Sequence, residues 1–442
     1  MRVRRPGRVE RQMHWQSGQA LVLGILLLGV IGIALNALFS TGRLIGVKAR
    51  QLNTVDAAAY SGALIQARAL NMQAYINIAQ TGHQMAMAHL VTLGSWAKFS
   101  ATQGQQASAG NPPAYLIGMM FGSGHMQAYQ SARKARAIAT LANPGNELFR
   151  AFDAHDRAVH DVLQAASMAI NQSLEAARDK AIEKVIMANY PEPQIRKELS
   201  WAVLKDNLQG FSAIFEPTGN YRSLIGQVAN VYRFLDERNH VRKNLWIVNE
   251  KCPWKRHELR RKGQTVLDEN GNWQSIDTES YHALRSNRWI GCYFREYPMG
   301  WGWVPGNANS IAMDLPYTQA PPDDFSGVDF WRWASKTTQW DIYGGNNNPL
   351  ANSRAIAARQ HWQGGGLANY VDIANAAKQS SVAFTLSITR KNAWGHDFTV
   401  SSTAQTFFER PQARVDRRVE KANFWHPYWQ ARLVDARQEV WQ

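Results

Sequence analysis

A chain of 442 residues that is 45% hydrophobic and 19% charged has the composition of a globular protein, and its length exceeds what one hydrophobic core usually supports. A mean hydropathy of -0.38 excludes a protein built mainly of membrane-spanning helices. The excess of 49 Lys and Arg over 34 Asp and Glu gives a formal charge of +15, which indicates either a solvated basic surface or an affinity for an anionic lipid, polymer or nucleic acid.

A basic tail of 18 residues precedes a stretch that carries no charge. Gln19 to Phe39 reads QALVLGILLLGVIGIALNALF, and about 20 apolar residues are needed to cross the hydrocarbon core of a bilayer. A cleaved secretory signal is the alternative, but its apolar region is about 7 to 15 residues long and a small-residue cleavage site follows it. The sequence therefore predicts a transmembrane helix over residues 19–39 that is retained in the mature protein.

The charges on either side of this helix predict its orientation. The tail, residues 1–18, contains five arginines and the single acid Glu10, whereas the far flank has Arg43, Lys48 and Arg50. Because positive charge is enriched on the cytoplasmic side of membrane helices, the tail is expected in the cytoplasm. A single-pass protein with nearly all of its mass on the other side follows from this orientation.

Residues 40–100 are expected to continue the helix beyond the membrane. No proline occurs between Pro6 and Pro112, and Ala, Leu, Gln, Arg and Met dominate the first part of this stretch. Gly42 and Gly46 predict a kink or break. A stripe of apolar and small residues at helical spacing suits packing against another helix, either in the same chain or in a partner. Its members are Leu52, Val55, Ala59, Gly62, Leu70, Ala74 and Ile78.

The next two segments are expected to be a loop and a second helical region. Residues 101–124 begin with a stretch rich in Ser, Gln, Gly and Pro, which is typical of a loop. Residues 125–245 contain long Ala-rich segments with a 3.6-residue pattern, and Gln194 to Asn207 is expected to add a short helix. Together these features predict a helical hairpin or small bundle that packs against the extended first helix.

Residues 246–442 are expected to form a Trp-rich distal domain that contains strands. Nine of the 17 tryptophans lie between Trp246 and Trp340. Asn270-Gly271 predicts a hairpin turn, and the alternating segments 381–391 and 396–411 predict a second antiparallel hairpin. The C-terminal residues are expected to add either a last strand or a short helix to it. Helices first and strands later give an α+β fold.

Cys252 and Cys292 are the only cysteines, so the chain has neither a disulfide framework nor a CxxC site for a metal or a redox reaction. A bridge between them would close a loop of about 40 residues and stabilise the fold by roughly 3 to 4 kcal/mol in an oxidising compartment. Two free buried thiols are the alternative.

The first helix also carries a family resemblance. Gly18 and Gln19 at the start of the span, followed by RLIGVKARQLNTVDAAAYSGA, resemble the N-terminal segment of TadG-like proteins. These belong to the TadE/TadG-related group of the bacterial tight-adherence (Flp) pilus assembly machinery. The resemblance covers about residues 15–70, and Tyr60 and Ser61 depart from the small apolar residues usual in that family. The matching motif residues are Leu52, Asn53, Asp56, Ala57, Ala58 and Ala59.

This resemblance implies a bacterial inner-membrane protein whose periplasmic part assembles or anchors a pilus and contacts pilus or envelope proteins. Some relatives are processed by prepilin peptidase. The residues after Gly18 lack the glutamate expected at the fifth mature position, which argues against a major fibre subunit and leaves cleavage between Gly18 and Gln19 open.

Catalytic motifs are missing from the sequence. It has no phosphate-binding loop, no GxSxG, no HExxH and no dinucleotide-binding glycine pattern, and its histidines are scattered. The sequence therefore predicts no enzyme, no cofactor and no metal site.

Clustered tryptophans offer a second functional reading. In RWIGCYFREYPMGWGWVP and DFWRWASK, the rings either fill a β core or stack on a glycan or protein partner. The candidate binding aromatics are Trp301, Trp303, Trp331 and Trp333. An envelope receptor for a glycan or another ligand is therefore the alternative function, and a nucleic acid is the least favoured partner.

Overall fold

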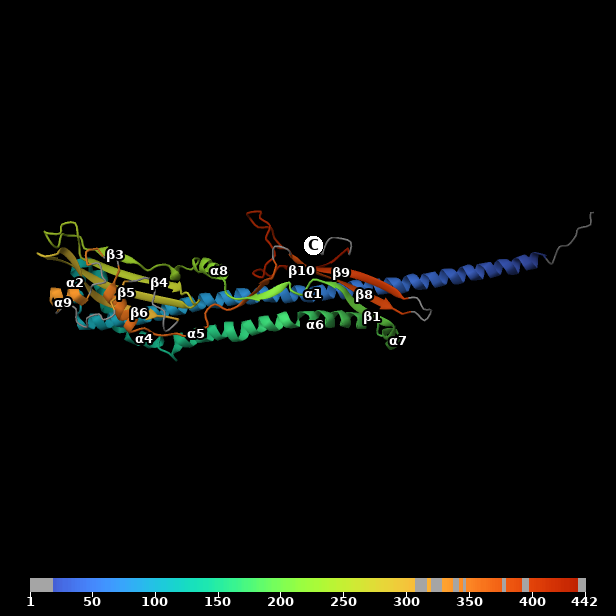
Figure 1. Ribbon diagram of the computed structural model, residues 1–442, viewed down its shortest axis with the longest axis horizontal. Helices are drawn as coiled ribbons and strands as arrows, with labels where there is room; N and C mark the ends of the chain where they lie inside the picture. The colour runs from blue at the N-terminus through green and yellow to red at the C-terminus, as the bar shows by residue number, and fades with distance from the viewer. Residues whose placement is uncertain are drawn as a thin grey trace, which may run out of the picture.

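The computed structural model is an elongated α+β molecule built along one long helix (Figure 1). It describes residues 19–306, 316–318, 328–336, 342–344, 347–375, 379–391 and 397–435. Helix α1, Gln19–Ala109, has 91 residues and is about 137 Å long at 1.5 Å per residue. The N-terminal part of α1 projects from the folded body, and the other elements pack along the remainder (Figure 1).

Two antiparallel four-stranded sheets pack on α1. The proximal sheet, nearer the projecting end, has the order β1-β8-β9-β10, with strands Leu199–Asp206, Ser381–Arg390, Phe398–Phe408 and Trp429–Val434. The distal sheet has the order β3-β4-β5-β6, with strands His240–Lys243, Glu258–Leu267, Trp273–Asn287 and Gly291–Val304. Strands β2, Ser212–Phe215, and β7, Tyr370–Ile373, form a two-stranded antiparallel sheet.

Shorter helices surround these sheets. Helix α5, Glu147–Arg157, a π-helical turn, Ala158–Leu163, and α6, Gln164–Asn189, run back beside α1 towards its projecting end (Figure 1). The others near the distal end are α2, Ala114–Phe121, α3, Ser123–Ser131, a 3-10 turn, Ala132–Ala137, and α4, Ile138–Leu141. The remaining helices are α7, Pro193–Glu198, α8, Gly219–Ala229, a 3-10 turn, Arg233–Leu235, α9, Phe330–Lys336, and α10, Pro349–Ala357.

Both hairpins expected in the C-terminal half are confirmed. Strands β4 and β5 pair across a turn in which Gly271 has a φ of +80°, a conformation that glycine adopts without strain. Strands β8 and β9 pair in register from Ser381 opposite Phe407 to Arg390 opposite Phe398. The C-terminal segment adds β10 to the edge of β9, so it contributes a strand.

The break expected near Gly42 and Gly46 is absent, because α1 is helical throughout this region. Nothing lies within 4 Å of the position that a Cβ would take at either glycine, so no neighbouring element bends the helix there. Each glycine costs a helix only about 1 kcal/mol, and the many good helix formers around them offset that cost.

The loop expected over residues 101–124 is also wrong for most of its length. Helix α1 continues to Ala109 and α2 begins at Ala114, so the break is confined to residues 110–113. Gly110 has a φ of +69°, and the two prolines that follow it prevent the helix from continuing. The polar residues before Gly110 remain helical because α1 packs there against the 3-10 turn, with Gly104 close to the backbone of Ala132.

The expected helical region, residues 125–245, contains three strands as well as helices. The helix predicted from Gln194 to Asn207 is replaced by α7, which ends at Glu198, and by β1, which begins at the next residue. Strand β1 forms because the segment LSWAVLKD pairs with β8, almost 200 residues later in the chain. Pairing with a distant edge overrides the local helical preference.

Small residues on α1 let the proximal sheet and α6 approach closely. Ala58, Ala59 and Ala63 are fully buried in a cluster with Phe384 of β8 and Ile182 of α6. Of the stripe predicted from the sequence, Leu52 and Ile78 are exposed and the other five residues are buried. The partner of this stripe is therefore the rest of the same chain.

A row of buried amides on α1 holds the C-terminal half of the chain through its backbone. Gln51 Nε2 donates hydrogen bonds to the carbonyl oxygens of Ile388 and Phe398, at 2.8 and 2.9 Å. Asn77 Nδ2 donates to those of Val371 and Phe424, both at 2.8 Å. The amide row consists of Gln51, Asn71, Asn77, Gln80 and Gln84, and Asn71 is its half-buried member. Gln73 Nε2 on the same helix donates instead to the carbonyl oxygen of Ser167 in α6. Since an unpaired buried carbonyl costs about 1 to 3 kcal/mol, the row stabilises the fold.

Replacing a member of this row is expected to destabilise the protein. In Asn77→Leu, the carbonyls of Val371 and Phe424 lose their donor, and we expect the free energy of unfolding to fall by at least about 2 kcal/mol. Asn53→Leu is the control, because Asn53 lies on the exposed face of the same helix. Thermal unfolding of the full-length protein in detergent micelles measures both changes, and equal midpoints for the two variants would contradict the prediction.

A histidine pair joins α1 to α5. The Nδ1 atoms of His83 and His155 are 2.7 Å apart, so one ring must donate while the other accepts. Burial, and then His155, lower the pKa of His83 below its usual value of 6.5. Because the unfolded chain then binds this proton more readily, the contribution of His83 to stability is complete above pH 6.5 and is lost as the pH falls.

The histidine pair therefore predicts a pH dependence. We expect His83→Gln to reduce the drop in unfolding midpoint between about pH 7.5 and about pH 5.5, since the titrating group is removed. His89→Gln on the exposed face of α1 is the control. If His83→Gln and the wild-type protein lost the same number of degrees over this interval, the pair would have no part in the pH dependence.

Candidate functional site

The projecting part of α1 has the properties of a membrane span. Among the described residues, α1 contains the one stretch that is long and apolar enough to cross a membrane, with a mean hydropathy of 2.6 and no buried residue. Leu28 and Leu38 are 69% and 75% exposed, and the apolar side chains next to them are also exposed. So large an apolar surface is unfavourable in water, which agrees with a single-pass anchor. The basic tail, residues 1–18 with Gly18, lies outside the described residues.

The folded body begins immediately beyond this span. Arg50 donates a hydrogen bond of 2.6 Å to the carbonyl oxygen of Asn189, at the end of α6, and its guanidinium lies 4.7 Å from the centre of the Tyr190 ring. Phe39 and Arg50 are 11 residues apart, or about 16 Å along a helix. Gln51, the next residue, binds the carbonyl oxygens of Ile388 in β8 and Phe398 in β9. The end of α6 and these ends of β8 and β9 therefore lie close to where α1 would leave a bilayer.

The residues that carry the family resemblance lie at this junction. Ala58 and Ala59 are fully buried against the proximal sheet and α6, and Asp56 is half-buried. Leu52, Asn53 and Ala57 lie on the exposed face. The motif thus has one face that packs within the chain and one that remains open to a partner.

Three of the four tryptophans that the sequence offers as binding residues are core residues. Trp303 and Trp333 are fully buried, and Trp301 is 8% exposed. Trp301 and Trp303 pack against α10, whereas Gly300 and Gly302, which alternate with them, face α1. Trp333 packs on Tyr293 and Phe330. Trp301 and Trp303 cannot stack on a partner because both faces of β6 are covered, and Trp333 cannot because it is buried under its neighbours. Of the four, only Trp331, 61% exposed, is available.

Three well-exposed tryptophans, Trp254, Trp289 and Trp331, lie instead at the end of the molecule opposite the span. We define the distal tip as loop 244–257, turn 288–290 and α9 (Figure 1). Trp254 and Trp289 are 73% and 65% exposed there, and the side chains of Leu245, Trp246 and Ile247 are also exposed. Trp254 and Trp289 are exposed because they stand in connections rather than in strands. Sequence reasoning missed them since nothing local distinguishes a loop tryptophan from a core one.

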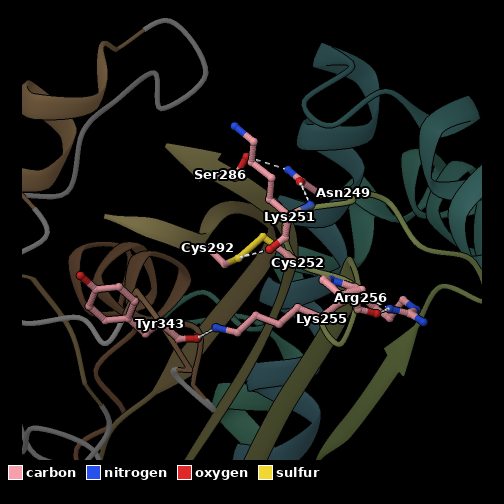
Figure 2. Close-up of a disulfide and its surroundings, with 9 residues drawn as sticks. Asn249, Lys251, Cys252, Lys255, Arg256, Ser286, Cys292 and Tyr343 are labelled. Atoms are coloured by element: carbon pink, nitrogen blue, oxygen red, sulfur yellow. Dashed lines mark hydrogen bonds between the residues drawn. A yellow bond between two sulfur atoms is a disulfide. The ribbon is translucent and has the colours of Figure 1, made fainter. Parts of the chain in front are cut away.

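A disulfide fixes the tip loop to the distal sheet. Cys252 in the loop is bonded to Cys292 at the start of β6, with the Cα atoms 6.0 Å apart (Figure 2). Beside it, Asn249 Nδ2 donates to Ser286 Oγ at 2.9 Å, and the Lys255 ammonium donates to the carbonyl oxygen of Tyr343. The loop therefore presents Trp254 from a rigid support.

The distal tip is strongly basic. Its cations are Lys251, Lys255, Arg256, Arg288 and Arg332, and the one acid among the described side chains of the same ranges is Glu250. The Arg288 guanidinium lies 4.5 Å from the centre of the Trp289 ring, a cation–π contact at the surface. An apolar and cationic surface of this kind suits an anionic partner.

The described part of the chain shows no group of three or more His, Cys, Asp or Glu side chains placed to hold a metal ion. Comparisons of the chain with protein-family models, with curated proteins and with solved structures found no match.

Proposed function

We propose that this protein is a non-enzymatic component of a Tad-like (Flp) pilus assembly or adherence apparatus, anchored in the bacterial inner membrane, with its folded body in the periplasm. The observation that carries the proposal is the continuity of α1. One helix contains both the apolar stretch that could cross a membrane and the part on which the two sheets pack. The resemblance to TadG-like proteins falls on the part of α1 where the span becomes the core. The exposed face of the motif there, with Leu52, Asn53 and Ala57, would contact pilus or envelope proteins.

Gene deletion with complementation tests this function. We expect the deletion strain to lose pili and surface adherence, and the full-length gene to restore both. A variant in which residues 19–39 are exchanged for an unrelated apolar helix of equal length separates anchoring from recognition within the span, and we expect it to restore piliation. Normal piliation in the deletion strain would overturn the proposal.

The orientation is tested with single introduced cysteines, since Cys252 and Cys292 are bonded to each other. We expect a membrane-impermeant maleimide to label Gln105→Cys in intact spheroplasts, because Gln105 is exposed on the folded body. Gln12→Cys in the basic tail should react only after permeabilisation. The opposite pattern would place the folded body in the cytoplasm.

A second candidate function is supported by the distal tip. Exposed Trp254, Trp289 and Trp331 amid five cations suit an envelope receptor for an anionic glycan, since flat rings stack on sugars and cations pair with their carboxylates or sulfates. We expect the full-length protein to bind alginate, and the triple alanine variant of these residues to lose binding with an unchanged unfolding midpoint. Tyr75→Ala, an exposed aromatic on α1 away from the tip, is the control. Equal binding by the triple variant and the wild-type protein would exclude the tip as a glycan surface.

A further inference from the structure

A cavity of about 220 Å³ lies between the distal sheet and α3, apart from the tip. Its polar wall is built by Gln103 of α1, His125 and Tyr129 of α3, His240 of β3, Arg261 of β4 and Glu279 of β5. Leu259 and Met299 supply apolar surface beside them. Since helices and strands contribute all of these side chains, the cavity is part of the rigid framework.

Two opposite charges share this cavity without pairing. Arg261 and Glu279 are directly opposite one another on β4 and β5, yet no ion pair within 4.0 Å joins them. The Glu279 carboxylate instead accepts a hydrogen bond of 2.5 Å from Gln103 Nε2. The side chain of Glu279 is therefore held from α1 rather than from the neighbouring strand.

Arg261 has few polar contacts for a guanidinium that is two-thirds covered. It lies 4.8 Å from the centre of the Phe99 ring and comes no closer than 4.0 Å to the carboxylate of Asp277, which already pairs with Arg238 at 2.8 Å. Its Nε is buried and meets no acceptor in the part of the chain that the structure describes. A buried guanidinium of this kind normally binds two oxygens of a carboxylate or phosphate.

The remaining groups of the wall are mostly uncharged at neutral pH. Burial raises the pKa of Glu279 to about 7, in spite of Arg261, so a large fraction of this carboxyl is protonated and can donate. Burial, and then Arg242 and His240, lower the pKa of His125. Burial also raises the pKa of Tyr129, which keeps its hydroxyl protonated. The wall thus combines a permanent cation with neutral donors and acceptors, which favours an anion that also carries hydroxyl or amide groups.

We propose that this cavity binds a small carboxylate-bearing ligand, such as a uronic sugar or an acylated amino acid, with its carboxylate on Arg261 and a neighbouring hydroxyl or amide on the Gln103–Glu279 pair. The ligand is either a free small molecule or the carboxyl end of a peptide, because both present the same group. The cavity is smaller than the sites that take drug-sized ligands, so one sugar ring or one to two amino-acid residues enter.

The test is isothermal titration calorimetry on the full-length protein in detergent micelles. The probes are D-glucuronate and N-acetylglycine, with D-glucose and N-acetylglycinamide as the uncharged counterparts. We expect the acids to bind at least tenfold more tightly than their neutral counterparts. A tetrapeptide acid and its amide form the third pair, and tighter binding of the peptide acid than of N-acetylglycine identifies a chain end as the source. Absence of binding by all three acids would overturn the proposal.

Variants locate the binding. Arg261→Gln should weaken the binding of the acids at least tenfold, and Arg68→Gln, on the exposed face of α1, should leave it unchanged. Ala128→Trp keeps the arginine but places a large ring at the cavity rim, and the exposed helical position of Ala128 tolerates it. This variant should block binding even if Arg261→Gln fails to fold. Undiminished binding by Ala128→Trp would place the ligand elsewhere, whatever the outcome for pili.

Discussion

Gly302→Ala is expected to lower the free energy of unfolding by about 3 kcal/mol or more, because α1 and β6 cross in direct backbone contact at this residue. A Cβ at Gly302 would lie 2.2 Å from the carbonyl oxygen of Ser95 and 2.6 Å from the amide nitrogen of Phe99. Neither backbone atom can turn away as a flexible side chain would. The strand must therefore move away from the helix.

Moving β6 away from α1 also breaks the hydrogen bonds at this crossing. Ser95 Oγ donates to the carbonyl oxygen of Gly302 at 3.2 Å, and Thr102 Oγ1 accepts from the amide nitrogen of Trp301 at 2.8 Å. Thr102 also donates to the Trp301 carbonyl oxygen at 2.6 Å. All of these groups are partly or fully buried, so each lost bond adds to the destabilisation.

Gly82→Ala is the matched control, because it makes the same substitution in α1 where nothing lies within 4 Å of the new Cβ. Alanine favours a helix over glycine by about 0.5 to 1 kcal/mol, so Gly82→Ala should raise the unfolding midpoint slightly. Tryptophan fluorescence during thermal or urea unfolding in micelles measures both variants. A Gly302→Ala protein as stable as the wild type would contradict the backbone contact between α1 and β6.

The double variant Cys252→Ser/Cys292→Ser is expected to lose about 3 to 4 kcal/mol of unfolding free energy, since the bridge closes a loop with a sequence separation of 40 residues. The effect should be greatest at the tip, where Lys251, Lys255 and Arg256 are sites for trypsin. We expect faster cleavage in loop 244–257 of the variant. Reduction of the wild-type protein is a built-in control, because it has no other cysteine and should reproduce the variant. Equal cleavage of the oxidised wild type and the variant would show that the loop is held without the bridge.

Local patterns predicted the elements whose signal is complete within a short stretch. The span at residues 19–39 is recognisable from hydropathy alone, and the two hairpins from alternation and an Asn-Gly turn. Strand β1 could not be predicted, because it depends on pairing with β8. The end of α1 at Ala109 was missed because Ser and Gly lower helix propensity without preventing a helix that has a packing partner.

The candidate sites were less predictable than the fold. The segment GWGWVP resembles a loop in composition, but its glycines face α1 and its tryptophans face α10, an arrangement that only the three-dimensional packing explains. Likewise, glutamines and asparagines on α1 look like a solvated face in the sequence, although all members of the amide row except the half-buried Asn71 are buried. The cavity is still less visible, since Arg261 and Glu279 meet Gln103 from a segment more than 150 residues earlier.

The amide row sets the order in which a newly synthesised chain can fold. Gln51 is made early, but the carbonyl groups that it binds come 337 and 347 residues later. While the ribosome adds those residues, α6 is already available to pack on the alanine-rich face of α1, but the amide row has no partner to cover it. Such distant contacts make folding slow. A product that terminates before β8 keeps the apolar N-terminal part of α1 but leaves the amide row uncovered, and such incomplete chains are prone to aggregate.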